Sequence, residues 1–161
     1  MAMIQQVREY LKVFGYVLSD HICMAVVTKE VKISTKGFTD IYDITSLADD
    51  FLKELSFGEG MINVFVPGST AGVTTIEFEP GAVSDLKVAF ERLIPQSIEY
   101  RHNLRWGDGN GFSHVRSAIC KASLTIPFVS SRLLLGTWQQ IILIDFDNKA
   151  RNRKLIFQAI G

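Results

Sequence analysis

The sequence predicts an α+β fold with a layered, mainly β core and a few helices. Strand-like runs and helical periodicities come in groups, whereas a parallel doubly wound sheet requires strict alternation of the two. The chain has 161 residues, 47% hydrophobic and 21% charged, which suffices for one sizeable core but leaves two cores marginal. We therefore expect a single domain over residues 24–161.

Residues 1–23 are predicted to form an amphipathic helix that extends this domain. Five apolar residues recur there at steps of three and four, the spacing of one helical face. These residues are Ile4, Val7, Leu11, Phe14 and Leu18. Because the first strand pattern begins near Met24, the helix is interpreted as an addition to the domain.

Alternation of polar and apolar residues predicts a strand over 26–33, followed by a second over 38–41. The Lys36-Gly37 turn between them indicates a hairpin. A helix capped by Asp43 or Thr45 is then expected to run through Leu55, since Leu47, Phe51 and Leu55 recur at four-residue steps.

The middle of the chain predicts two paired strands over 61–66 and 73–78. Apolar spacing then predicts a helix over 83–93, which ends before Pro95. An irregular, glycine-rich stretch follows, with a short helix over 115–121.

The last third is predicted to be mainly sheet, with strands over 123–128, 133–135, 138–146 and 154–159. The aliphatic run from Ile141 to Ile144 indicates a strand that is buried on both faces.

The charge balance and the cysteines argue against several kinds of binding partner and structural site. Lys and Arg number 17, as do Asp and Glu, so no net field favours nucleic acid or an anionic membrane. Cys23 and Cys120 form no CxxC pair, which argues against a disulfide framework and a thiolate zinc site. The chain shows neither a signal-peptide pattern nor a run of about 18 apolar residues. We expect a cytoplasmic protein.

The first candidate segment is the loop 67–72, which contains Ser69 and Thr70 and is followed by Glu77. Small residues let the backbone approach a ligand, and exposed amides with two hydroxyls can hold an anion. A glycine-dependent hairpin turn is the competing and commoner interpretation.

The second segment, residues 100–116, holds two of the three histidines. His102 and His114 flank Asp108 and Asn110 in a glycine-rich stretch, and such groups bind a divalent cation or move protons near neutral pH. Zn and Mg are both candidates, although the spacing matches no zinc signature. Arg116 is interpreted either as a phosphate ligand or as an ordinary ion-pair partner.

The third segment runs from Gly136 to Gln140. Gln139 and Trp138 are candidates for a pocket wall, although a core position is the commoner role of a Trp. The basic stretch 149–154 is interpreted as a solvated hairpin, with anion binding as the minor alternative. The GxSxG elbow, the P-loop and the GxGxxG motif are absent from the sequence, so hydrolase-triad, NTPase and Rossmann functions lack support.

Taken in order, these segments resemble the YjbQ family, whose proteins are often labelled secondary thiamine-phosphate synthase. The resemblance covers roughly 24–161 and is carried by STKGFTDIYDIT, VFVPGSTAGVTTIEFEPG, YRHNLRWGDGNGFSHVRSAI and SRLLLGTWQQIILIDFDNKARNRK. It implies a layered α+β fold, a homotrimer, and a polar pocket near the subunit boundaries that holds a metal ion in some cases.

The resemblance also implies roles for individual residues. His102, Asp108 and His114 would act as catalytic groups or metal ligands, with Glu77 as a further catalytic carboxylate. The substrate or anion would contact Ser69, Thr70, Asn110 and Gln139, and the chemistry of the second segment adds Arg116 to this set. Two departures remove an imidazole: many relatives have His at the position of Phe112, and some have His in place of Gly68.

Three functions follow as expectations. The first is an enzyme acting on a phosphorylated small molecule, similar to thiamine-phosphate synthase, in which cationic groups stabilise a leaving pyrophosphate and His114 assists proton transfer. The second is a non-catalytic trimer that binds a metal or an anion. The third is a metal-assisted hydrolase in which Asp108 or Glu77 serves as base.

Overall fold

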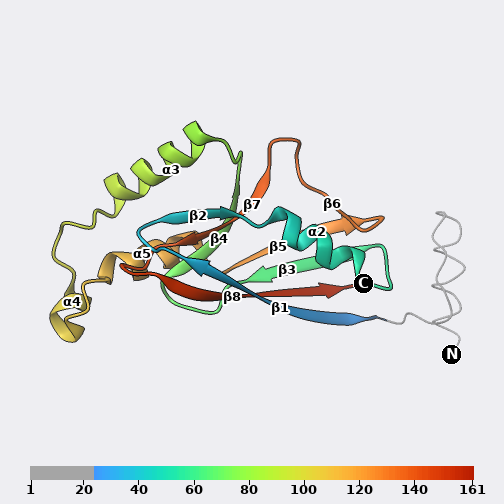
Figure 1. Ribbon diagram of the computed structural model, residues 1–161, viewed down its shortest axis with the longest axis horizontal. Coiled ribbons are helices and arrows are strands. Elements are labelled where there is room, and N and C mark those ends of the chain that lie inside the picture. The colour runs from blue at the N-terminus through green and yellow to red at the C-terminus, as the bar shows by residue number, and fades with distance from the viewer. Residues whose placement is uncertain (1–23) are drawn as a thin grey trace, which may run out of the picture.

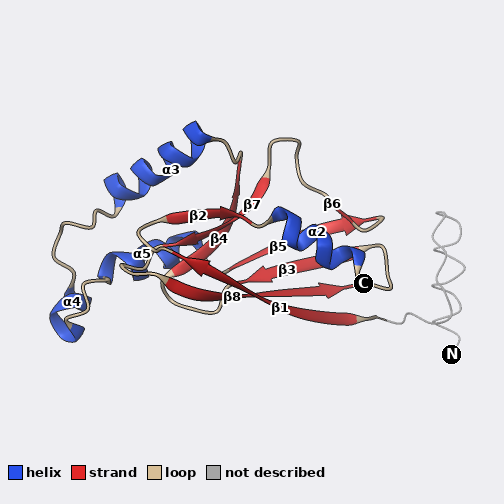
Figure 2. Ribbon diagram, in the orientation of Figure 1, coloured by secondary structure: helices blue, strands red, loops and turns tan. Residues whose placement is uncertain are grey.

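The computed structural model describes residues 24–161, and the helix predicted over 1–23 lies outside the described residues (Figure 1). Two antiparallel sheets form the domain, one with strand order β1–β8–β3–β5–β6 and one with order β2–β7–β4. The strands are β1 (Val26–Thr35), β2 (Asp40–Asp43), β3 (Gly60–Phe65), β4 (Ala71–Ile76), β5 (Ser123–Val129), β6 (Arg132–Leu133), β7 (Gln140–Asp145) and β8 (Arg151–Ile160). The α+β fold with a mainly β core is therefore confirmed (Figure 2).

Four helices accompany the sheets in the described part of the chain. They are α2 (Thr45–Lys53), α3 (Pro80–Leu93), α4 (Arg101–Trp106) and α5 (Gly111–Cys120). None of the helices within 24–161 is both long and apolar enough to cross a membrane. In Figure 1, α4, α5 and the turn between β7 and β8 gather at the end of the sheets that lies away from the C-terminus.

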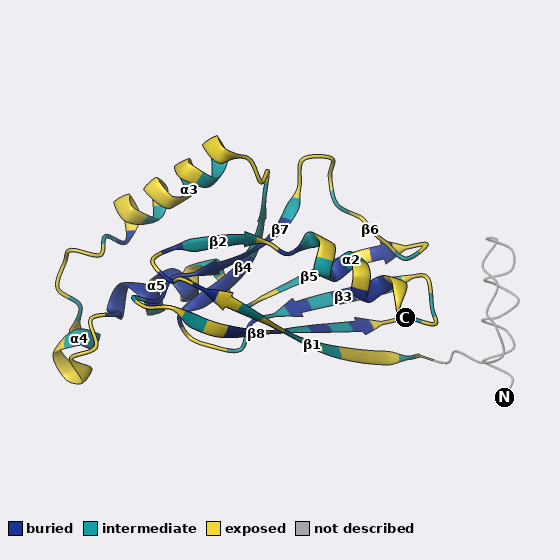
Figure 3. Cartoon of the chain, in the orientation of Figure 1, coloured by how far each residue is buried: buried dark blue, intermediate teal, exposed yellow. Residues whose placement is uncertain are grey.

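The main core is built from apolar residues of both sheets and of α2. Strand β8 shows how the pleat feeds this core, because Leu155, Phe157 and Ala159 are buried while the residues between them are less so. Figure 3 shows buried residues along β7, β8 and α2. Non-directional burial of these side chains is the main source of stability.

Strand β7 is buried on both faces, as its aliphatic run predicts. Ile141 and Leu143 face the main core, whereas Ile142 and Ile144 belong to a second cluster that includes Phe90 of α3. All four isoleucine and leucine residues of the run are fully inaccessible to solvent. Helix α5 therefore packs on the outer face of the smaller sheet, and α3 reaches the second cluster through Leu86 and Phe90.

Both predicted strand pairings are wrong. Strand β1 pairs with β8 along ten positions and β2 pairs with β7, so the two strands enter different sheets. Likewise β3 pairs with β5 and β8, while β4 pairs with β7. Alternation fixes which face of a strand is buried but not its partner, and here the partners lie far along the chain.

The turn after β1 explains why no hairpin forms. Phe38 and Thr39 both have positive φ, after Gly37, and the Phe38 amide donates to the Asp147 carbonyl at 2.6 Å. A Cβ at Gly37 would meet the carbonyl oxygens of Asp147 and Lys149 at 2.6 and 2.5 Å, so glycine is needed there. The chain therefore leaves one sheet and enters the other beside the β7–β8 turn.

The helix predictions are correct in place and differ in extent. Helix α2 ends at Lys53, and Asp43 accepts a hydrogen bond from the Thr45 amide at 2.9 Å ahead of it. Helix α4 lies in a stretch that was predicted to be irregular, because its six residues are too few to show the helical period of apolar residues. The core position considered for Trp138 is wrong, since this side chain is 71% exposed.

Candidate functional site

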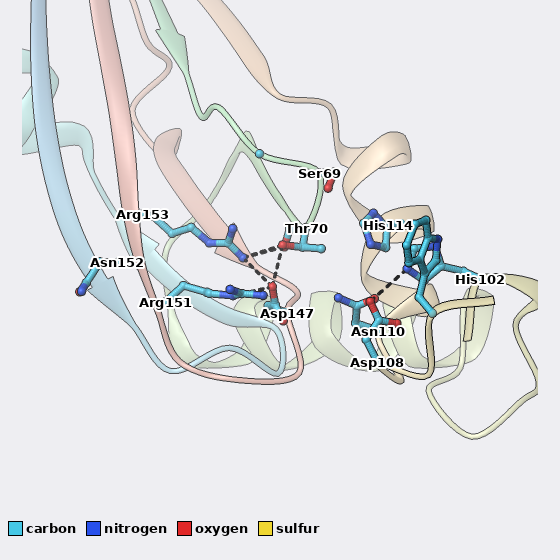
Figure 4. A pocket seen from close by; sticks show the side chains of 12 residues that line it. Ser69, Thr70, His102, Asp108, Asn110, His114, Asp147, Arg151, Asn152 and Arg153 are labelled. Carbon is cyan, nitrogen blue, oxygen red and sulfur yellow. Dashed lines mark hydrogen bonds and ion pairs between the residues drawn. The ribbon is translucent and has the colours of Figure 1, made fainter. Parts of the chain in front are cut away.

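A cavity of about 500 Å³ opens between the loop before β4, the α4–α5 region and the β7–β8 turn (Figure 4). It has two walls of different chemistry. We call the first the histidine wall, which comprises His102, Trp106, Asp108, Asn110 and His114. We call the second the arginine wall, which comprises Asp147, Arg151, Asn152 and Arg153. Gly68, Ser69 and Thr70 line the cavity as well.

The histidine wall centres on a His–Asp pair. His102 Nε2 lies 3.3 Å from Asp108 Oδ2. With its amide nitrogen facing this pair, Asn110 donates at 3.1 Å to both Asp108 oxygens and lies 3.2 Å from His102 Nε2. Asn110 is 7% exposed, so it holds the more accessible Asp108 and His102 in place. This pair can accept and return a proton.

His114 stacks beside His102, with ring centroids 4.3 Å apart and an angle of 45° between the rings. Burial lowers the pKa of His114, and the neighbouring His102 lowers it further, while Asp108 and Asp147 act in the opposite direction. His114 is therefore held in its neutral form more strongly than an exposed histidine.

Local packing fixes the loop that carries this wall. Helix α4 ends at Gly107, which has φ of 66° and donates to the Asn103 carbonyl at 2.8 Å. The Gly111 amide donates to the Asn103 side chain at 2.8 Å, and a Cβ at Gly111 would overlap the side chain of Tyr100. Glycine at 111 therefore lets α5 begin close against α4.

The arginine wall is an ion-pair network in which Asp145, Asp147 and Arg153 are buried. Arg153, only 8% exposed, donates from Nε to Asp145 Oδ2 at 2.8 Å and from Nη2 to Asp145 Oδ1 at 2.5 Å. Its Nη2 also donates to the Thr70 hydroxyl at 2.8 Å. Arg151 Nε donates to Asp147 Oδ2 at 2.8 Å. Bidentate pairing of this kind fixes the plane of a guanidinium.

Asp147 joins the network to the loop before β4. The Thr70 hydroxyl donates to Asp147 Oδ2 at 2.9 Å, as the dashed line in Figure 4 shows. Burial acts to raise the pKa of Asp147, but the hydrogen bonds from Arg151 and Thr70 and the charges of both arginines outweigh it and lower the pKa. The carboxylate is thus ionised at neutral pH and matches the charge of Arg151.

Six of the nine predicted site residues line this one cavity. They are Ser69, Thr70, His102, Asp108, Asn110 and His114. These residues come from two segments that are separate in the sequence, 67–72 and 100–116, and the fold places the segments side by side.

The other three predicted site residues lie elsewhere. Glu77 follows the end of β4, outside the lining of the cavity. Gln139 lines a separate cavity of about 490 Å³ beside α2, and its amide nitrogen donates to the Thr75 hydroxyl at 3.0 Å.

Arg116 is a structural side chain in this fold. It is 1% exposed and its Nε and Nη2 atoms donate to the Ile94 carbonyl at 3.0 and 2.6 Å. Its remaining donors reach the Thr39 hydroxyl at 2.8 Å and Glu91 Oε2 at 2.7 Å. These contacts tie α5 to the end of α3, so Arg116 does not line the cavity between the two walls.

The three predicted metal ligands do not form a metal centre as arranged. Within residues 24–161, no group of three or more His, Cys, Asp or Glu side chains is placed to hold a metal ion. His102 and Asp108 face each other, and His114 stacks on the ring of His102. This geometry fits proton transfer more directly than metal coordination.

The basic stretch 149–154 differs from its main interpretation as a solvated hairpin, because Arg151 and Arg153 line the cavity and Arg153 is buried. Anion binding, the minor alternative for this stretch, stays a prediction. The available signal was the two-residue spacing of these arginines, which places both on one face of a strand. Asp145 and Asp147 precede them with the same spacing.

The fold and site define an α+β protein of two packed antiparallel sheets with one polar, two-walled pocket at the end of the sheets. A family model described as UPF0047 protein YjbQ-like matches residues 29–161. The chain belongs to this family, so the resemblance inferred from the motifs is confirmed.

Relatives in several species are similar along most of their length. A UPF0047 protein of Mycobacterium bovis is 39% identical over 119 residues, which is 73% of this chain and 90% of the relative. A UPF0047 protein of Methanothermobacter thermautotrophicus is 31% identical over 140 residues, which is 87% of this chain and 96% of the relative.

Solved structures show the same fold. A protein of unknown function from Sulfolobus solfataricus matches with a TM-score of 0.81 and 26% identity, covering 86% of this chain and 99% of that one. An uncharacterised family protein from Clostridium acetobutylicum matches with a TM-score of 0.75 and 30% identity, covering 81% and 98%.

Proposed function

We propose that this protein binds a phosphorylated small molecule between the two walls and moves a proton on it with the His102–Asp108 pair. One observation carries the proposal: a cavity of about 500 Å³ joins a fixed guanidinium wall to a His–Asp–Asn cluster. Arginines recognise phosphate through several N–H donors, and a His–carboxylate pair supplies acid–base chemistry near neutral pH.

The charge balance of the site limits the kind of ligand. Arg151 and Arg153 are matched by Asp147 and Asp145, so the arginine wall offers directed donors with little net charge. Asp108 adds a carboxylate on the other wall. A ligand with a phosphate at one end and hydroxyl or amine donors at the other complements this arrangement better than a simple polyanion.

The finer form of the proposal is a reaction similar to thiamine-phosphate synthesis. In that reaction, a thiazole nitrogen attacks a carbon of the pyrimidine fragment and pyrophosphate leaves that carbon. His102 or His114 would donate or accept any proton that the fragments exchange with the protein. Arg151 and Arg153 would stabilise the leaving anion.

Product analysis tests this proposal. Purified protein is incubated with the pyrimidine pyrophosphate and the thiazole phosphate, and separately with simple phosphate esters. Joined product indicates a synthase, inorganic phosphate alone indicates a hydrolase, and bound but unchanged ligand indicates a binder. Absence of binding by any phosphorylated compound would reject the proposal.

Binding without turnover is the second candidate, and the position of Glu77 favours it. The carboxylate predicted as a further catalytic group lies outside the cavity, which leaves one His–Asp pair for all proton transfer. This candidate predicts a dissociation constant for phosphorylated ligands that does not change when His102 is replaced by Gln.

Metal-assisted hydrolysis is tested by metal content. His102, Asp108 and Asn110 converge within 3.1 to 3.3 Å, and a Zn or Mg ion would need a further donor beyond them. Stoichiometric metal in the purified protein that is lost in a folded His102→Ala, His114→Ala double variant would favour the hydrolase over the metal-independent proposal.

The homotrimer and the cytoplasmic location are part of the proposal. The loop before β7 exposes Trp138 by 71% and Leu134 by 56%, and apolar side chains of this size are commonly covered at subunit contacts. Cys120 carries a free thiol, as expected in a reducing compartment. Light scattering should give three times the 18.0 kDa chain mass, and a monomer at micromolar concentration would contradict it.

A further inference from the structure

Arg153 is the buried guanidinium of the arginine wall, and its hydrogen bonds hold it in place. Arg153 uses Nε and Nη2 for Asp145 and Thr70. Its Nη1 donates no hydrogen bond to any residue within 24–161.

The unpaired nitrogen is open to the cavity. Asp147 Oδ1 is the one buried side-chain nitrogen or oxygen of the described residues that lacks a hydrogen-bond partner, so the unpaired Nη1 is not sealed from solvent. Arg153 as a whole is only 8% exposed and lines the cavity, which leaves the cavity as the direction from which Nη1 can be reached. A buried arginine with two N–H donors facing a polar cavity is suited to an oxyanion.

Gly68 controls access to this nitrogen. A Cβ placed on Gly68 would lie 3.4 Å from Arg153 Nη1, in direct contact with it, so any side chain there would cover part of the donor. Gly68 also has φ of 153°, a conformation that side chains rarely adopt. The loop therefore presents a bare backbone to the one available edge of Arg153.

We propose that the corner between Gly68 and Arg153 is the phosphoryl subsite of the pocket, with a terminal phosphate oxygen on Arg153 Nη1. The inference rests on the proposed function and adds the direction in which the ligand lies in the pocket. The phosphate lies at the arginine wall, and the remainder of a phosphomonoester or diphosphate points toward His102 and Asp108.

The neighbouring carboxylates are compatible with this subsite. Asp145 accepts two hydrogen bonds from Arg153, which fixes the guanidinium in the plane that presents Nη1. Asp147 Oδ2 lies 3.6 Å from Arg153 Nη2 and is paired with Arg151 at 2.8 Å, so its charge is already matched. Because these carboxylates match the charges of the two arginines, we expect weak binding of inorganic phosphate. Its affinity should depend on hydrogen-bond geometry more than on net charge.

Calorimetry with inorganic phosphate and pyrophosphate tests the subsite on the full chain. Arg153→Lys keeps the positive charge but lacks the second nitrogen, so it should weaken pyrophosphate binding at least tenfold. Lys154→Ala is the control, because it removes an exposed cationic side chain of the same strand that lies outside the cavity, and it should change the affinity less than threefold. An equal or larger loss in Lys154→Ala, or an unchanged affinity in folded Arg153→Lys, overturns the inference.

A measurement on the unaltered protein covers the case in which Arg153→Lys does not fold. Nitrogen NMR of the arginine side chains should show a saturable shift of the Arg153 guanidinium signal when phosphate is added. A shift confined to Arg151 or to the histidines overturns the subsite while leaving the proposed function standing. If neither phosphate, pyrophosphate nor any phosphorylated compound binds, the proposed function and the subsite fail together.

Discussion

The two walls of the pocket are built in opposite ways. The arginine wall belongs to the start of β8 and rests on Asp145 and Asp147, both fully inaccessible to solvent. The histidine wall stands on the six-residue helix α4 and the loop after it, where the side chains of His102 and Asp108 are 31% and 43% exposed. The fold thus holds Asp145, Asp147 and Arg153 firmly and leaves His102 and Asp108 more room to move.

The largest effect is expected from Asp145→Asn, which breaks the arginine wall. This change leaves Arg153 buried without its carboxylate, and removing one partner of a buried pair costs about 3–5 kcal/mol. Chemical denaturation measures the change in unfolding free energy. Asp50→Asn, which removes an exposed partner of Lys53, is the control and should leave the midpoint almost unchanged. A similar response of both variants would mean that the wall is not held as described.

Replacement of Arg116 by Met separates folding from binding. The Ile94 carbonyl and the Thr39 hydroxyl would lose their donor, and an unpaired buried group costs about 1–3 kcal/mol. Because Arg116 does not line the two-walled cavity, pyrophosphate affinity of the folded variant should stay within threefold of the parent. A tenfold loss would restore Arg116 as an anion ligand.

His102→Gln tests the histidine wall. Its exposed pair with Asp108 contributes little to folding, so the unfolding free energy should change by less than about 1 kcal/mol. Turnover of any substrate found by product analysis should fall at least 100-fold, because general acid–base catalysis supplies about that much or more. Full turnover in this variant would move the acid–base role to another residue.

The smallest effect concerns pH. The pKa of His114 is lowered in the folded state, so the unfolded chain binds more protons as the pH falls from about 6.5. The contribution of neutral His114 to stability is therefore present above that pH and is lost on acidification. His114→Gln should flatten the dependence of unfolding free energy on pH between 7 and 5. Parallel curves for parent and variant would show that burial of this ring does not govern its protonation.

Several features were predictable because they depend on local pattern. The aliphatic run 141–144 identified a strand buried on both faces, and the glycine-rich segment 100–116 identified the histidine wall. The burial of Arg153 in the arginine wall was not predicted, because a basic stretch is usually a solvated surface. Asp145, the partner of Arg153, lies on β7, in the other sheet, and the two come together only where the sheets pack.

The sequence by itself determined the fold class, the family, the approximate elements and six of the side chains that line the pocket. The tertiary structure decided the strand partners, the burial of Arg153 and Arg116, and the removal of Glu77 and Gln139 from the site. The physical reason is one of range. Periodicity reports which face of an element avoids water, whereas strand pairing and the hydrogen bonds of the pocket join residues far apart in the chain, such as Thr70 and Arg153.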